Sequence, residues 1–159
     1  MANKIVTLYI DDISIRLLVT RGKEISKWAY APLEAGMVES AVILDEDGVA
    51  GKIKEMLDTQ AISTVKINVG VSGLLCLTRA ISLPQLPKGM LDEAVLREAK
   101  KLMPLAMENL YNISWQLLPR ANNQTHVFMV AVRQKTIDAL IRTLDKVGRK
   151  VRFLDLKPR

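Results

Sequence analysis

The side chains that could do chemistry are few and scattered in this sequence. His126 is the only histidine and Cys76 the only cysteine, too few for a zinc site built from these ligands. No Ser-His-acid or Cys-His arrangement can be argued from their spacing. His126 begins one apolar stretch, which favours a structural role, and Cys76 lies in another, which favours packing. We therefore predict no catalytic residues and no metal ligands, and a protein that is not an enzyme.

Two short polar segments interrupt the apolar stretches. Asp11 and Asp12 separate two alternating stretches, and this pattern predicts a hairpin turn. The segment GVSG at 70–73 ends a continuous apolar stretch, and its amides could bind an anion. It lacks the lysine and the spacing of a P-loop, so we interpret it as a chain reversal.

Composition limits the classes of function. The chain has 159 residues, 49% hydrophobic and 25% charged, enough for one real core or two small ones. Its net charge of +6 permits weak attraction to nucleic acid or an anionic membrane, but aromatic residues at 4% leave few platforms for base stacking. The basic residues are spread out, with a modest concentration over 142–159, which favours a solvated face.

The sequence also indicates a compartment. A single cysteine allows no internal disulfide and suits a reducing environment. No apolar run approaches the roughly 20 residues that a membrane span needs. We expect a cytosolic protein, or one peripheral to a membrane.

Hydrophobic periodicity and turn residues predict a mixed α/β (α+β) chain. The order is βββαβ, then βαββα, then one strand, so the second unit is predicted to be inserted into the first. Pro84 and Pro87 stop one strand and precede a long helix, and Gly148 ends another helix. The predicted strands are 4–10, 14–21, 24–31, 65–71 (buried and parallel), 76–83, 113–118, 126–132 and 151–156, and the predicted helices are 49–57 (capped by Asp45 or Asp47), 88–102 and 137–147.

Several separated segments carry a family resemblance. They are SLPQLPKGMLDEAVLREAKKLMP with Glu108, Tyr111 and SWQLL after it, INVGVSGLLCLTRAISLP before it, and the closing FLDLKP. Together they resemble the first half of PilM-type pilus assembly proteins, which share the actin-like fold of the cell-division protein FtsA. The resemblance covers nearly all of this chain but only the first half of the family's length, which implies a fragment of a longer protein or, as the alternative, a naturally short relative. It also implies a partial actin-like (ribonuclease-H-like) subdomain over 1–75, an inserted SHS2-like βαββα subdomain over 76–149, and a returning strand over 150–159.

The resemblance further implies where a nucleotide site would lie. In that family the first hairpin carries a phosphate-binding pattern like D-I-G-S-S-S-V-K. The matching residues here read YIDDISIR: Ser14 and Arg16 keep the pattern, Tyr9 replaces the acid, and Asp11 replaces the glycine. Asp11 and Asp12 would each repel a phosphate by about 4 kcal/mol per charge pair at 4 Å and an effective dielectric of 20. We therefore predict a degenerate phosphate loop at Asp11, Asp12, Ser14 and Arg16, and no cofactor for this chain. ATP with Mg²⁺ is expected only in a longer form.

Three functions follow from these observations. The resemblance implies a non-catalytic cytoplasmic adaptor at the bacterial inner membrane, which docks the N-terminal peptide of a PilN-like membrane protein between the two subdomains. One alternative is an actin-like ATP-binding protein or ATPase whose second half is missing here. The other is a small RNA-binding module, which the positions of Trp28, Tyr30, Trp115 and Phe128 disfavour. Unpaired sheet edges could also form a homodimer; no nucleic acid partner is expected.

Overall fold

The computed structural model describes residues 4–72, 76–102, 111–119 and 123–156. Contacts divide the chain into two compact units, Met1–Leu74 with Thr136–Arg159, and Leu75–Lys135. Some residues that carry the family resemblance, among them Gly73, Pro104, Glu108 and Pro158, lie outside the described part. Among the described helices, none combines the length and the apolar character that crossing a membrane requires.

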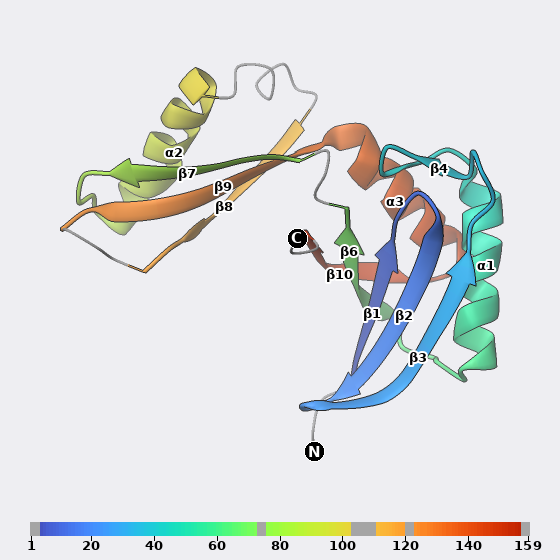
Figure 1. The fold of residues 1–159 in the computed structure, drawn as a ribbon. Coiled ribbons are helices and arrows are strands. Elements are labelled where there is room, and N and C mark those ends of the chain that lie inside the picture. The colour runs from blue at the N-terminus through green and yellow to red at the C-terminus, as the bar shows by residue number, and fades with distance from the viewer. Residues whose placement is uncertain (1–3, 73–75, 103–110, 120–122, 157–159) are drawn as a thin grey trace. The chain divides into compact units, whose positions relative to one another are not determined.

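The first unit is built on a five-stranded sheet in the order β10-β6-β1-β2-β3 (Figure 1). The first three strands form an antiparallel meander, and β6 pairs in parallel with both β1 and β10. This confirms the prediction of a buried parallel strand. The strand bounds are β1 Lys4–Ile10, β2 Ser14–Arg21, β3 Glu24–Pro32, β6 Lys66–Val71 and β10 Lys150–Leu156.

Two helices contribute to the single core of this unit, α1 (Glu46–Thr59) and α3 (Gln134–Lys146). Asp45 caps α1, as predicted, because its side chain accepts a hydrogen bond from the Gly48 amide at 2.9 Å. Alternate residues of the strands supply the other side of the core. Each fully buried Leu, Ile or Val contributes about 1.5–3 kcal/mol. The largest of these side chains are Leu8, Ile15, Leu17, Ile53, Leu57, Ile67 and Leu144.

The position of α3 corrects the predicted division of the chain. The helix was expected to close an inserted unit over 76–149, but its buried residues Ala139, Leu140 and Leu144 belong to the core of the first unit. The second unit therefore ends at Lys135, and its order is βαββ. The physical reason is that helical periodicity shows which residues of a helix share a face, but not which sheet that face covers.

A small hairpin that the sequence did not predict lies between β3 and α1. It consists of β4 (Val38–Glu39) and β5 (Val42–Ile43). The two residues of its turn, Ser40 and Ala41, have φ of 54° and 57°, as in a type I′ turn. Such turns normally carry Asn or Gly, so this sequence gave no signal for one.

The second unit is a three-stranded antiparallel sheet, in the order β7-β9-β8, with one helix in its core (Figure 1). Its elements are β7 (Leu77–Leu83), α2 (Lys88–Leu102), β8 (Tyr111–Leu117) and β9 (Thr125–Arg133). These confirm the predicted helix at 88–102 and the hairpin after it. The apolar stripe of α2 packs with inward residues of the sheet, namely Leu91, Ala94, Val95 and Ala99 with Val127, Met129 and Ala131.

Candidate functional site

The turn between β1 and β2 holds the residues that the resemblance places at a phosphate site. Asp11 organises this turn through its own side chain. Its Oδ1 accepts hydrogen bonds from the amide of Ile13 at 3.1 Å, the amide of Ser14 at 2.8 Å and the Ser14 hydroxyl at 3.0 Å. Ser14 is fully buried. The segment is thus a hairpin turn closed by an aspartate, as the residue pattern predicted.

Asp12 points to a different partner, the β4–β5 hairpin. Its two carboxylate oxygens accept hydrogen bonds from the amides of Ser40 at 3.0 Å and Ala41 at 2.9 Å. Both residues have positive φ, a backbone conformation that costs energy for residues with a Cβ. The carboxylate offsets part of this cost, and it occupies two adjacent amides that could otherwise face an external anion.

Arg16 completes the network on β2. Its guanidinium lies 3.6 Å from Asp11 Oδ2 and 5.7 Å from the centroid of the Tyr9 ring. Tyr9, which replaces the acid of the family pattern, therefore provides a cation–π contact. A Cβ at Gly70 would lie 3.2 Å from the Tyr9 ring, so a larger residue on the neighbouring strand would require the ring to shift by a few tenths of an ångström. Gly70 lies within β6, inside the predicted strand 65–71, so the chain reversal expected at 70–73 does not begin at this residue.

These contacts define what the turn can do chemically. The structure brings Asp11, Ser14 and Arg16 into one network and directs Asp12 to the neighbouring hairpin. The hydroxyl and amide donors around Asp11 already bind a carboxylate of the chain itself. A phosphate at this position would have to displace that carboxylate while facing two negative charges. The arrangement therefore serves as a structural turn, and the loss of nucleotide binding stays a prediction.

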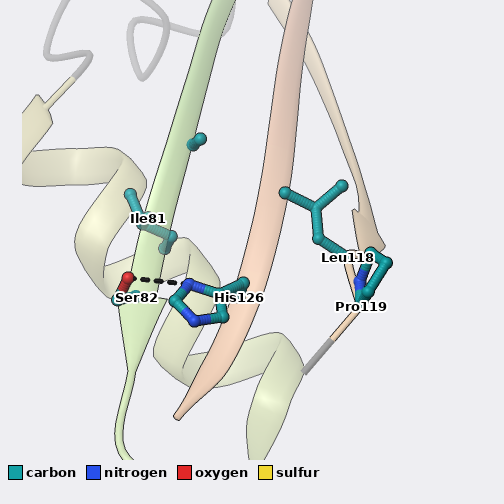
Figure 2. A pocket seen from close by; sticks show the side chains of 6 residues that line it. Ile81, Ser82, Leu118, Pro119 and His126 are labelled. Carbon is teal, nitrogen blue, oxygen red and sulfur yellow. Dashed lines mark hydrogen bonds between the residues drawn. The ribbon is translucent and has the colours of Figure 1, made fainter. Parts of the chain in front are cut away.

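A second candidate site lies on the sheet of the second unit. Ser82 on β7 and His126 on β9 are register partners, and Ser82 Oγ lies 2.9 Å from His126 Nδ1 (Figure 2). This pair is not evident in the sequence, because the two residues are 44 positions apart and only the strand register brings them together. No group of three His, Cys, Asp or Glu side chains among the residues that the structure describes could hold a metal ion.

The Ser82–His126 pair borders a hollow of about 370 Å³. Figure 2 shows its lining side chains, which come from β7, from β9 and from the residues just after β8. Its other walls are mostly apolar. This volume is near the lower end for ligand pockets, about 300 Å³, so the hollow can accept one apolar group and offer it a polar rim. The lining residues are Ala80, Ile81, Ser82, Leu118, Pro119 and His126.

Cys76 is a half-buried thiol next to β7. Burial raises its pKa, which keeps the thiol protonated and unreactive. This agrees with the packing role that the sequence favoured.

The fold is that of a partial actin-like domain, and solved structures share it. The chain matches a chain of a "PilM-PilN type IV pilus biogenesis complex" with a TM-score of 0.86 and 22% identity, over 99% of this chain and 48% of that one. It matches the cytoplasmic domain of EpsL, an inner membrane component of the Vibrio cholerae type II secretion system, with a TM-score of 0.63 and 13% identity, over 99% and 60%. A third match is a Bacteroides thetaiotaomicron protein with an actin-like ATPase fold and unknown function, with a TM-score of 0.50 and 10% identity, over 96% and 51%.

The family model described as type IV pilus assembly protein PilM matches residues 10–158. The chain therefore belongs to the PilM family. It spans about half the length of the matched chain from the PilM-PilN complex, 48%. No curated protein matches it.

Proposed function

We propose that this chain is part of a non-catalytic adaptor for the assembly of a type IV pilus or a related secretion or DNA-uptake machine. The adaptor is cytoplasmic, peripheral to the inner membrane, and docks the cytoplasmic N-terminal tail of a PilN-like membrane protein. The observation that carries this proposal is the likeness of 99% of the chain to a chain of a PilM-PilN complex, at a TM-score of 0.86. Membership of the PilM family supports it.

The chemistry of the first unit favours an adaptor over an ATPase. The β1–β2 turn presents two carboxylates, and its hydroxyl donor is bound by Asp11. Catalysis of phosphoryl transfer needs donors and cations held free for the phosphates. In this chain Arg16, the cation of the turn, pairs with Asp11 instead.

The hollow of the second unit offers an anchor for the tail. Peptides that dock on a sheet commonly insert an apolar side chain into a pocket and gain specificity from a polar neighbour. Ala80, Leu118 and Pro119 supply the apolar walls, and the Ser82–His126 pair supplies the polar rim. We assign the tail's apolar anchor to this hollow.

Calorimetric titration with a synthetic N-terminal peptide of the PilN-like protein from the same cell tests the proposal. Ala80→Glu places a charge in the hollow at an exposed position and should weaken peptide binding at least about tenfold, since burying an unpaired charge costs more than 1.4 kcal/mol. The control is Trp28→Ala on the edge strand β3, where the ring is 71% exposed; it should bind normally. Loss with Trp28→Ala and none with Ala80→Glu would reject the hollow as the anchor.

A titration with Mg-ATP, on this chain and on the longest native form, tests the non-catalytic part. We expect no binding by this chain. Metal-dependent ATP binding followed by hydrolysis would overturn the adaptor proposal. Sedimentation of the chain with and without peptide tests the homodimer, which stays a prediction.

A further inference from the structure

A small basic cavity lies on the first unit, at the end of the sheet opposite the Asp11 turn. It has a volume of about 230 Å³ and sits where β1, β6 and β10 begin. The parallel pairing of these strands brings their first residues to the same end of the sheet. The Asp11 turn lies at the other end, because it follows the last residue of β1. The cavity is lined by Lys4, Ile5, Val6, Thr64, Lys66, Asn68 and Arg152.

The charge of this cavity is unbalanced. Three of its lining residues, Lys4, Lys66 and Arg152, are cationic, and none is acidic. Within the described part of the chain, no ion pair joins these three to a carboxylate. Some other cations of the same unit are paired; Arg142, for example, lies 2.8 Å from Glu46. Like charges that share a cavity repel one another, and a bound anion would offset that repulsion.

A β-bulge places Arg152 at this position. The register of β10 against β6 shifts between Val151 and Phe153, so Arg152 is the extra residue. Bulges redirect a side chain and occur often beside functional sites. Side chains alternate between the two faces of a sheet, so without the extra residue either Arg152 or the residues after it would lie on the other face. The bulge therefore explains how a third strand adds a guanidinium to the cavity.

Asn68, which lines the cavity, has an unsatisfied polar atom in the described part of the chain. Its Oδ1 is buried and has no hydrogen-bond partner within the described residues. Most buried polar atoms in proteins are hydrogen-bonded, so each exception requires an explanation. The two ends of an amide exchange places by a half-turn of the side chain, and the exchanged amide would present an N–H donor where the unpaired oxygen now lies.

We propose that this cavity binds a phosphate group. Lys66, Arg152 and Lys4 would supply charge-assisted hydrogen bonds, and the exchanged Asn68 amide would supply a neutral one. Donors from three strands suit a tetrahedral anion with several acceptor oxygens better than a flat carboxylate. The cavity of about 230 Å³ falls below the roughly 300 Å³ of sites for drug-sized ligands, which matches one phosphate rather than a nucleotide. The phosphate comes either from a soluble small molecule or from the headgroup of an anionic phospholipid.

Two binding measurements on the whole 159-residue chain test this site. The first follows backbone amide shifts in NMR spectra during titration with inorganic phosphate, and the second measures flotation with phosphatidylglycerol–phosphatidylcholine vesicles against pure phosphatidylcholine. The test variant is Lys66→Gln with Arg152→Gln. The matched control is Arg97→Gln with Lys100→Gln, which removes the same charge from exposed positions of α2.

We expect phosphate to shift the amides around Lys66, Asn68 and Arg152. The test variant loses the charge-assisted hydrogen bonds from Lys66 and Arg152, and its affinity for phosphate should fall at least about tenfold. The affinity of the control should change less than about twofold. Asn68→Asp, which keeps the shape and adds a negative charge, should also abolish binding. Melting temperatures check that each variant folds.

Comparison of the phosphate titration with the vesicle flotation identifies the source of the phosphate. Binding of inorganic phosphate alone supports a soluble ligand, and vesicle binding that requires Lys66 and Arg152 supports a headgroup. Equal losses in test and control variants would overturn the proposal, since bulk charge would then account for binding. Binding of neither probe would overturn it as well.

Discussion

Replacing Asp11 with alanine tests whether the β1–β2 turn is a structural device or a phosphate loop. The substitution removes three acceptor contacts from one oxygen, to Ile13 N, Ser14 N and Ser14 Oγ. It also removes the ion pair with Arg16. If the turn is structural, the loss should appear as a lower free energy of unfolding.

The size of the effect follows from the exposure of each partner. Ser14 is fully buried, and leaving its amide and hydroxyl without an acceptor costs about 1–3 kcal/mol. Ile13 is 68% exposed, so water replaces the carboxylate at its amide at little cost. The half-exposed ion pair with Arg16 adds about 0–1 kcal/mol. The sum is about 1–4 kcal/mol.

Asp11→Asn is the matched control, because it keeps the Oδ1 acceptor and removes only the charge. It should cost less than about 1 kcal/mol. Urea titrations in which hydrogen exchange is measured at the amides of Leu8 and Leu17 report the stability of the first unit alone, because both residues are buried in it. An Asp11→Ala variant as stable as the parent would refute the structural interpretation, and so would a gain of Mg-ATP binding.

Three further predictions concern the first unit. Leu144→Ala should lower the stability of the first unit by about 2–5 kcal/mol and leave the amide protection of the second unit unchanged. Ile141→Ala, at a position that is 43% exposed, should cost no more than about 0.5 kcal/mol. Loss of protection in the second unit alone would show that α3 packs with that unit instead. The hydrogen bond from Arg142 lowers the pKa of Glu46 below its ordinary value of 4.5. The stability that ionised Glu46 contributes to the folded unit is therefore present above about pH 4.5 and is lost as the pH falls through the lower folded pKa. Glu46→Gln should flatten this acid dependence in urea titrations. Ala41→Gly should raise the melting temperature, because glycine adopts the φ of 57° without the cost of about 1–2 kcal/mol that an L-residue bears there. The greater entropy of glycine in the unfolded chain offsets part of this gain. A lower melting temperature would show that the turn is not strained.

The elements with local signals were the ones that sequence could predict. Pro84 and Pro87 end β7 and precede α2, and the predicted bounds of that helix, 88–102, are the observed ones. Gly148 has a φ of 66° just past α3, the left-handed cap that the sequence indicated. In each case the determinant is a residue whose backbone allows few alternatives.

The features that sequence could not predict depend on long-range contacts. The apolar stripe of α3 is evident in the sequence, but its packing with the first unit also rests on ion pairs to Glu46 and Asp47, from Arg142 at 2.8 Å and Lys146 at 2.7 Å. These residues are almost a hundred positions apart. The β4–β5 hairpin likewise lacks a local turn signal and is held by Asp12 from another hairpin.

The two ends of the first sheet differ in how their charges are used. At the Asp11 turn, both carboxylates and Arg16 satisfy one another or nearby amides. At the opposite end, the cations Lys66 and Arg152 have no acidic partner among the described residues. An anion approaching the first unit would therefore be repelled at the Asp11 turn, where the family resemblance places a phosphate site, and attracted where the parallel strands begin. If the chain responds to a phosphate-bearing ligand, the response should depend on Lys66 and be insensitive to Asp11→Asn.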